Sequence, residues 1–309
     1  MRIAVVGAGI SGVACAGGLA RAGHDVVVLD RGRVPGGRMA SRRIEGRYVD
    51  LGASYLTARD ADFIAVVDDW VGRGLARPWT DTFGVASPAG VGEPTRGPVR
   101  YAAPGGLRSL VADLATGLDV RQDVEVTSVG PGPVVDGAAY DAVVLAMPDP
   151  QALRLLGPSL AAERAAVEGR AWEPVLALAA GWPARDWSFD GVFVHGSDVL
   201  AWVADDGARR GDGAPVLVAH STPGFAATRL ADPPAAGPAL VAALCALLGL
   251  GQPTWSRVQR WTFAKPVGTR EQTHWLGAAR VGLCGDGWGA AKVEAAWLSG
   301  TALGKALLG

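Results

Sequence analysis

The chain has 309 residues, 49% of them hydrophobic, and a formal net charge of -1 from 29 basic and 30 acidic side chains. This content is enough for a large core, and the length predicts one elaborate domain or two interleaved ones. The balanced charge, without a basic tail, argues against a nucleic-acid partner. No apolar run approaches the ~20 residues of a membrane span, and the N-terminus lacks the pattern of a signal peptide. We therefore expect a cytoplasmic protein without a membrane partner.

The cysteines and histidines exclude two further classes. Cys15, Cys245 and Cys284 lie far apart in apolar segments, which predicts buried free thiols in a reducing compartment. The four histidines have no metal-ligand spacing, so no metal site is expected. The 11 tryptophans fall mostly outside the first 30 residues, which is consistent with an aromatic-lined cavity in a second region.

A glycine-rich motif lies between the first predicted strand and the first predicted helix. The apolar run 3–6 precedes Gly7-Ala8-Gly9-Ile10-Ser11-Gly12, and the apolar run 25–29 ends in Asp30. Strand, tight turn, helix and a second strand with a terminal acid predict a dinucleotide-binding βαβ unit. The alternative is a glycine-rich turn without a ligand.

Each residue of this motif has an expected role. Gly7 permits the turn, Gly9 lets the backbone approach a pyrophosphate, and Gly12 lets the helix pack on the strand. The N–H groups of the first helical turn then face the phosphates, and the carboxylate of Asp30 accepts hydrogen bonds from the ribose hydroxyls. The motif does not specify which dinucleotide binds.

Further elements follow in chain order. Helices are predicted over 63–75, 107–115, 153–167, 238–250 and 291–308, a hairpin or meander over 77–99, and strands over 120–126, 143–148, 175–180, 191–195, 200–204, 216–220, 258–263 and 281–284. The strands near both chain ends extend a parallel sheet, whereas the middle of the chain predicts a mostly antiparallel sheet with helices. We predict an α/β fold in which residues 1–64, 96–150 and 268–309 form a discontinuous dinucleotide-binding domain. Residues 65–95 and 151–267 form a substrate domain.

Three more segments have the composition of a binding site. Pro35-Gly36-Gly37 is a predicted turn, and the following Arg38 could bind phosphate, although taken alone it is better explained as a solvated surface arginine. Residues 48–57 have small side chains at their middle, which leaves room for a flat ring, or alternatively marks a bulge in a buried strand. Gly285-Asp286-Gly287 forms a turn before the C-terminal helix.

In this order, the segments 7–12, 36–39, 50–55 and 285–286 resemble the FAD-contacting segments of the flavin amine-oxidase superfamily. Within it, the chain is most similar to renalase-like flavoproteins of the bacterial type. The segments that carry this likeness are 50–57, 144–151, 220–225, 259–261 and 285–288. The resemblance spans the whole chain and implies a Rossmann-like FAD-binding domain of the glutathione-reductase/amine-oxidase type.

The resemblance assigns roles along the cofactor. Arg38 would touch the phosphates or the flavin side of the linker, Val124 the adenine and Asp286 the ribityl chain. Met39 and residues 52–55 would lie along the isoalloxazine. The helix beginning near Lys292 would direct its N–H groups at the flavin N1/C2=O edge, where reduced flavin carries negative charge. The full cofactor set is Gly7, Gly9, Ile10, Ser11, Gly12, Asp30, Arg31, Gly37, Arg38, Met39, Gly52, Ala53, Ser54, Tyr55, Val124, Met147, Gly285, Asp286, Lys292 and Val293.

Two departures from related enzymes matter. Cys284 lies in an apolar strand rather than an attachment loop, so noncovalent FAD is expected. Many amine oxidases have a lysine that holds a water at flavin N5. Lys265 is the nearest candidate, but a solvated lysine at a strand end is the better explanation.

The resemblance implies oxidation of the 2- and 6-dihydro isomers of NAD(P) to NAD(P)+ by hydride transfer to FAD, with dioxygen reduced to hydrogen peroxide. The candidate residues around the substrate are Tyr55, Trp202, His220, Trp261 and Trp288. A tryptophan in so apolar a sequence is more often a core residue than a pocket residue, and the histidine could equally be a hydrogen-bonded core residue. Two alternatives stay open: an amine oxidase acting on a small amine or polyamine, and a flavin-bound protein without turnover.

Overall fold

The apolar run after Met1 forms β1, a central strand of the first sheet in the computed structural model, which describes residues 1–87 and 90–309. The six strands lie in the order β18-β19-β12-β1-β2-β8, and all neighbours run parallel except β18 and β19. The strands are β1 (Arg2–Val6), β2 (Asp25–Leu29), β8 (Asp119–Arg121), β12 (Ala142–Ala146), β18 (Trp275–Leu276) and β19 (Val281–Cys284).

Alternating side chains bury both faces of this sheet. Ile3 and Val5 of β1 join one core, and Ala4 and Val6 join the other. The first core is completed by α1 (Ile10–Arg21), α2 (Ala61–Gly72), α3 (Leu107–Leu114) and α9 (Val293–Leu308). The second core is completed by α4 (Asp149–Leu155), α5 (Ala161–Val167) and residues of the small sheet of β9 (Val129–Gly130), β10 (Val134–Val135) and β11 (Ala138–Ala139).

The middle of the chain forms an eight-stranded sheet in which all neighbours are antiparallel except β5 and β14. Its strands are β5 (Arg77–Ser87), β6 (Gly90–Val91), β7 (Thr95–Ala102), β13 (Trp172–Gly181), β14 (Gly191–Val194), β15 (Leu200–Asp205), β16 (Val216–Ser221) and β17 (Trp255–Pro266). One face is covered by α7 (Pro223–Ala227) and α8 (Gly237–Leu248), with the short helix η2 (Pro234–Ala236) beside them.

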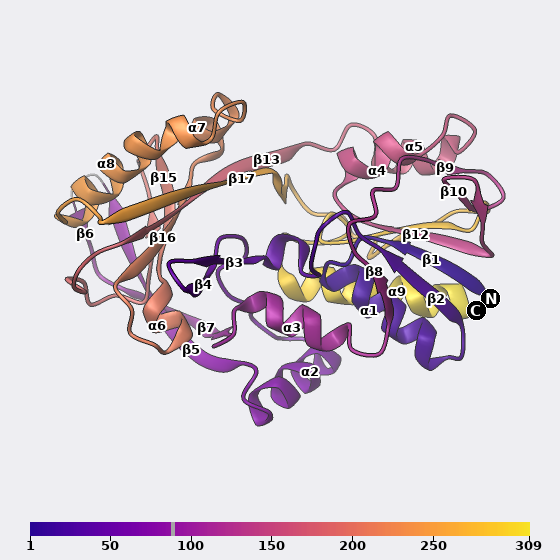
Figure 1. Ribbon diagram of the computed structural model, residues 1–309, viewed down its shortest axis with the longest axis horizontal. Coiled ribbons are helices and arrows are strands. Elements are labelled where there is room, and N and C mark those ends of the chain that lie inside the picture. Colours follow the sequence, from indigo (N-terminus) through magenta and orange to yellow (C-terminus); the bar gives the residue numbers. More distant parts are fainter. Residues whose placement is uncertain (88–89) are drawn as a thin grey trace.

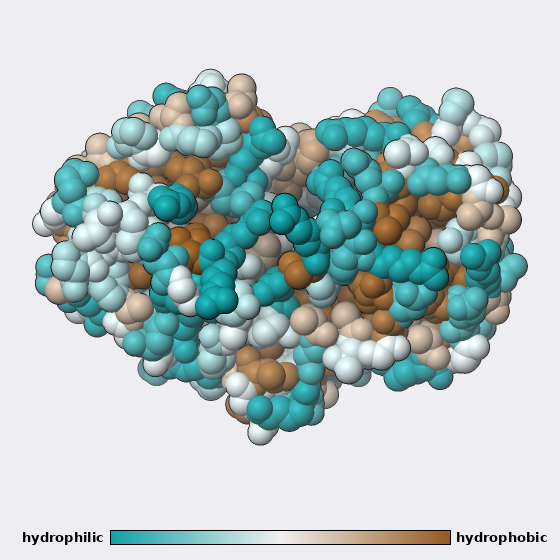
Figure 2. All heavy atoms as spheres, in the orientation of Figure 1, coloured by the Kyte–Doolittle hydropathy of each residue, from teal (hydrophilic) through white to brown (hydrophobic). Residues whose placement is uncertain are grey.

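The other face of this sheet meets the hairpin of β3 (Ser41–Ile44) and β4 (Arg47–Asp50). Val49 and Leu51 pack there against Ala177 of β13 and Val218 of β16. The two lobes are seen side by side, with both chain ends in the lobe of the first sheet (Figure 1). The surface narrows between the lobes along its upper edge (Figure 2). The predicted fold, a Rossmann-like domain with a second, mostly antiparallel sheet, is confirmed.

Several predicted elements are corrected. The single helix over 153–167 is wrong: Gly157 and Pro158 separate α4 from α5, and a proline cannot continue a helix from the residues before it. The strand over 120–126 ends at Arg121, since Asp123 takes a left-handed backbone with φ of 56°. Residues 95–102 pair with β5 and so lie in the second sheet, although the prediction assigned 96–150 to the first domain. The boundaries as a whole stay a prediction.

The structure also bears on the expected meander, the cysteines, metal ligands and membrane-spanning helices. Residues 88–89, inside the predicted 77–99 meander, lie outside the described residues. Cys15, Cys245 and Cys284 are buried and free, as expected. Over 1–87 and 90–309 no group of three potential metal ligands occurs. In the same ranges no helix has the length and apolarity needed to cross a membrane.

The first and last helices pack without space for a side chain. A Cβ at Gly300 of α9 would overlap with the carbonyl oxygen of Ser11 in α1. We expect Gly300→Ala to lower the free energy of unfolding by about 1–3 kcal/mol, because the helices must separate. Gly18 lies in α1, and a Cβ there would face open space. Gly18→Ala should therefore raise the free energy of unfolding by about 0.5–1 kcal/mol. Urea unfolding of both variants tests this, and equal effects would refute the tight-contact explanation.

Candidate functional site

The glycine motif forms the turn from β1 into α1, and its three glycines differ in their surroundings. Gly7 has φ of 112°, and a Cβ there would lie 2.6 Å from the carbonyl oxygen of Ala146. A Cβ at Gly12 would overlap with the carbonyl oxygen of Gly7. No atom lies within 4 Å of a Cβ built on Gly9, whose φ of -78° any residue can adopt. The outer glycines therefore serve packing, and the middle one leaves open space at the helix N-terminus, as a pyrophosphate requires.

Asp30, at the end of β2, connects this turn to the next loop. Its two carboxylate oxygens accept hydrogen bonds from the N–H groups of Ala8 and Gly32, each at 2.6 Å. The backbone N–H of Val124 donates to the Asp30 carbonyl at 3.0 Å, so the structure brings this candidate residue to the motif. The side chain of Arg31 is exposed beside it. Each carboxylate oxygen keeps a further lone pair for a ribose hydroxyl, so the predicted role is compatible with this geometry.

Arg38 and Asp286, 248 positions apart, form a two-pronged ion pair. Nη1 and Nη2 of Arg38 donate to the two carboxylate oxygens at 2.7 and 2.5 Å. Arg38 follows the turn at Gly36 and Gly37 and lies in the short helix η1 (Gly37–Met39). It is therefore not the solvated surface arginine that the residue alone would favour, because its side chain is 29% exposed and is paired.

The C-terminal motif adjoins the same place. The N–H of Gly285 donates to Oγ of Ser299 in α9 at 2.9 Å, which holds the turn against this helix. Met147 lies next to it, its carbonyl oxygen 3.8 Å from a Cβ built on Gly285. α9 begins at Val293, with Lys292 as its N-cap residue. Ile10 and Ser11 are buried in the first turn of α1. α9 thus links the turn at Gly285 to the first turn of α1, because Ser299 holds Gly285 and Gly300 lies against Ser11.

Residues 51–55 run between the two sheets. The N–H of Ala53 donates to the Arg38 carbonyl at 2.9 Å, and a Cβ on Gly52 would overlap with that same oxygen. Two tryptophans of the second sheet hold the segment from the other side. Nε1 of Trp261 donates to the Leu51 carbonyl at 2.7 Å, and Nε1 of Trp202 donates to Oγ of Ser54 at 2.9 Å.

A buried ionic cluster, which the sequence reasoning missed, holds the same segment. It consists of Asp50, Asp206, Arg209 and Arg210, none more than 6% exposed. Nη2 of Arg209 pairs with Asp206 at 2.5 Å and donates to the Asp50 carbonyl, while Nη1 donates to the Ser54 carbonyl at 3.0 Å. Burial acts to raise the pKa of Asp206, but the surrounding guanidinium groups hold it below its usual range. The signal was the spacing of Asp206 from Arg209 and Arg210 in α6 (Asp206–Arg210), which places three charges on one short helix.

Tyr55 and Trp202 lie in one aromatic cluster. Its members are Tyr55, Trp79, Phe83, Phe193 and Trp202. The ring centroid of Phe83 lies 5.3 Å from Tyr55 and 4.7 Å from Trp202. Of this aromatic cluster, the sequence reasoning singled out only Tyr55 and Trp202.

His220 pairs with Trp202 across the β15–β16 ladder, so both side chains leave the same face of the sheet. The Nε2 atom of His220 is buried and has no hydrogen-bond partner among the described residues. Burial, together with the charges of Arg209 and Lys265, lowers the pKa of His220 to about 3. The ring is therefore neutral at ordinary pH.

Two candidates lie elsewhere. Trp288 belongs to the core on the other face of the first sheet, with the guanidinium of Arg270 4.2 Å from its ring centroid. The structure thus does not bring Trp288 to the aromatic cluster. Nζ of Lys265 lies 3.3 Å from Glu173 in an ion pair, and its side chain is 50% exposed. This agrees with a solvated lysine at a strand end.

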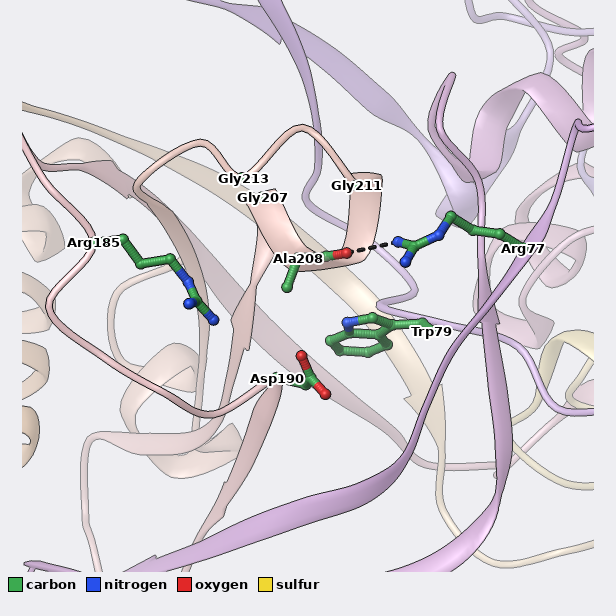
Figure 3. A pocket seen from close by; sticks show the side chains of 8 residues that line it. All are labelled: Arg77, Trp79, Arg185, Asp190, Gly207, Ala208, Gly211 and Gly213. Atoms are coloured by element: carbon green, nitrogen blue, oxygen red, sulfur yellow. Dashed lines mark hydrogen bonds between the residues drawn. The ribbon is translucent and has the colours of Figure 1, made fainter.

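A pocket of about 340 Å³ opens beside Trp79. Its lining residues are Arg77, Trp79, Arg185, Asp190, Gly207, Ala208, Gly211 and Gly213 (Figure 3). Arg77 donates to the Ala208 carbonyl at 2.7 Å, and Arg185 donates to Asp205. Both arginines are therefore already partnered, whereas the indole Nε1 of Trp79 is buried without an acceptor.

The parallel sheet and the glycine turn at its carboxyl edge define a Rossmann-like dinucleotide-binding fold. Residues 5–70 match the family model of the NAD(P)-binding Rossmann-like domain. A 4,4'-diapophytoene desaturase from Staphylococcus haemolyticus is 40% identical over 60 residues, which cover 19% of this chain and 12% of that protein. A hydroxyneurosporene desaturase from Rubrivivax gelatinosus is 43% identical over 58 residues, 19% of this chain and 11% of the desaturase.

Solved structures share the fold over nearly the whole chain. A protein named as a protoporphyrinogen oxidase from Exiguobacterium sp. superposes with a TM-score of 0.77 at 14% identity, covering 99% of this chain and 98% of that one. Putrescine oxidase bound to putrescine gives a TM-score of 0.75 at 17% identity with the same coverage. The chain therefore shares its overall fold with these two oxidases.

The buried histidine makes stability depend on pH. The ordinary pKa of 6.5 applies in the unfolded chain, and about 3 applies to His220 in the fold. Between these values only the unfolded chain binds this proton, so stability is lost as the pH falls below 6.5. In this window His220→Gln should remove up to about 1.4 kcal/mol per pH unit from the slope of unfolding free energy.

Chemical denaturation at pH 4 to 8 measures the slope. His195→Gln, at an exposed position, controls for the loss of a histidine as such. An unchanged slope in His220→Gln would show that the ring is charged or solvated in the fold.

Proposed function

We propose that the protein is an FAD-dependent oxidase that binds its cofactor noncovalently and oxidises 2- and 6-dihydro-NAD(P) isomers to NAD(P)+. One observation carries the cofactor assignment: the open turn at Gly9, the Arg38–Asp286 pair and residues 52–55 adjoin one another, and α9 holds the turn that contains Asp286. These are the segments in which the sequence resembles flavin amine oxidases. The fold shared with oxidases over 99% of the chain supports the same assignment.

The residues fit such a cofactor from one end to the other. The cradle at Gly9 accepts phosphates, and the guanidinium of Arg38 can share its charge with them. Gly52 and Ala53 place no bulky side chain in the segment that the resemblance assigns to the flavin ring. The N-cap residue Lys292 makes no side-chain capping bond, and the first N–H groups of a helix have no partner within it, so the N-terminus of α9 would favour negative charge on a ring edge. FAD would supply the acceptance of a hydride and the return of two electrons to dioxygen, which forms hydrogen peroxide.

The chain contributes orientation more than acid-base chemistry. Tyr55 and Trp202 offer aromatic surfaces on which a dihydropyridine can lie beside residues 52–55. His220, neutral by burial, leaves Nε2 without a partner and can make a hydrogen bond without adding charge. The three cysteines are buried, and burial raises the pKa of Cys284 to about 12, so its thiolate is not available for a covalent link.

A substitution at Gly9 should weaken cofactor binding without affecting folding. Gly9→Ala should leave the free energy of unfolding of the apoprotein near that of the natural chain, because the added methyl group meets only open space. The same methyl group would occupy the path of the pyrophosphate, so FAD affinity should fall at least about 10-fold. Flavin titration by fluorescence quenching measures the affinity. Gly18→Ala is the matched control, and unchanged FAD affinity in Gly9→Ala would contradict this cofactor site.

The substrate is tested on the purified yellow protein without oxygen. Borohydride-generated mixtures of dihydro-NAD(P) isomers should bleach the visible flavin band within seconds, and the product should be NAD(P)+. A panel of small amines and polyamines, added separately, should leave the band unchanged. Bleaching by amines but not by the isomers would replace the proposal with an amine oxidase. A band that neither class bleaches would indicate a flavoprotein without this turnover.

A further inference from the structure

Arg100, in strand β7, is a buried cation without a counter-ion. The residue is only 8% exposed, and its guanidinium carbon lies 4.0 Å from the ring centroid of Phe83. In the part of the chain that the structure describes, no carboxylate forms an ion pair with it. Its Nη1 atom is buried and has no hydrogen-bond partner there. An arginine stays charged at all ordinary pH values, so this arrangement is unfavourable until an acceptor arrives.

A second unsatisfied donor belongs to the same cluster. The indole Nε1 of Trp79 is buried without an acceptor, and its ring lies 5.4 Å from Phe83 and 6.3 Å from Tyr55. Trp79 also lines the 340 Å³ pocket (Figure 3). An indole N–H can only donate. Among the described residues, Nη1 of Arg100 and Nε1 of Trp79 are therefore two donors without an acceptor in one aromatic cluster.

The cluster adjoins the proposed reacting region. The ring of Trp202 makes an edge contact with Phe83, with the ring centroids 4.7 Å apart, and its indole nitrogen donates to Ser54, within the segment assigned to the flavin ring. Burial raises the pKa of Tyr55, and Arg100 opposes this rise through its charge and a hydrogen bond. The phenol thus stays neutral at physiological pH and cannot balance the guanidinium. Asp190 lines the neighbouring pocket but forms no ion pair with Arg100.

We propose that Arg100 is a specificity-determining residue that binds an oxygen acceptor of the substrate and excludes cationic amines. This inference rests on the proposed function for the position of the reacting ring. In a dihydronicotinamide dinucleotide the acceptor is either the carboxamide oxygen or a phosphate oxygen, and a guanidinium binds both. A protonated amine brought to the same cluster would meet an unpaired positive charge at low dielectric, which opposes its binding.

The test measures binding to the purified flavoprotein by isothermal titration calorimetry, which does not depend on flavin reduction. The probes are NAD+, nicotinamide, inorganic pyrophosphate and the diamine putrescine. Arg100→Met should weaken NAD+ about 10–100-fold, the range expected for a lost hydrogen bond to a charged group. Arg100→Lys keeps the charge but not the planar fork, and should weaken it by a smaller factor. Arg96→Met, on the same strand but 83% exposed at its side chain, is the matched control and should bind as the natural chain does.

The set of probes that lose affinity in Arg100→Met identifies the oxygen that Arg100 binds. A loss confined to NAD+ and nicotinamide assigns the carboxamide, and a loss confined to NAD+ and pyrophosphate assigns a phosphate. Undiminished affinities in Arg100→Met, no binding of any acceptor to the natural chain, or tighter binding of putrescine than of nicotinamide would each overturn the inference. If Arg100→Met does not fold, the graded loss in Arg100→Lys decides. Failure of the dihydro isomers to bleach the flavin, with the Arg100-dependent loss intact, overturns the proposed substrate alone.

Discussion

The two sheets are joined at residues 50–55, whose backbone carbonyls are held by side chains from the second lobe. The guanidinium of Arg209 donates to the carbonyls of Asp50 and Ser54, and the indole of Trp261 donates to that of Leu51. Arg209 is itself fully buried and anchored on Asp206. A buried ion pair adds little net stability, but the loss of one partner leaves a costly unpaired charge. The position of the candidate ring-binding surface thus depends on a cluster whose charges cannot be removed singly.

The same cluster explains how the lobes stay in register. Asp50, at the end of β4, accepts hydrogen bonds from Ser41 in the neighbouring strand and from the N–H of Leu107 at the start of α3. Arg210 reaches the other Asp50 oxygen at 3.0 Å. One carboxylate therefore links the hairpin, a helix of the first lobe and α6 of the second. This arrangement suits a site formed between two domains, because neither domain contains it alone.

The sequence predicts best what depends on neighbours in the chain. The turn at Gly7, the acid at Asp30 and the strands of both sheets follow from local pattern, and the structure has them in those places. Apolar periodicity alone misses short elements and breaks. It predicts one helix across Pro158 and a strand beyond Arg121, and it gives no sign of the short helix α6. What no pattern contains is the pairing of Arg38 with Asp286, or the absence of a counter-ion at Arg100. Which charged side chains come within pairing distance is decided by tertiary packing. The sequence shows which residues are charged but not how far apart they lie in the fold.

The contact between α1 and α9 has a consequence for how the protein is made. Gly300 and Gly304 pack on Ser11 and Cys15, so the first helix completes its buried face only against the last one. A growing chain exposes the first β-strand and α1 long before α9 exists, while every strand of the second sheet is already synthesised. The lobe of the second sheet can therefore form first, whereas the lobe of the first sheet is completed only by a contact between α1 and α9, which are separated by nearly the whole chain. A chain that ended before α9 would therefore keep every strand of both sheets but lose the contact that completes the buried face of α1.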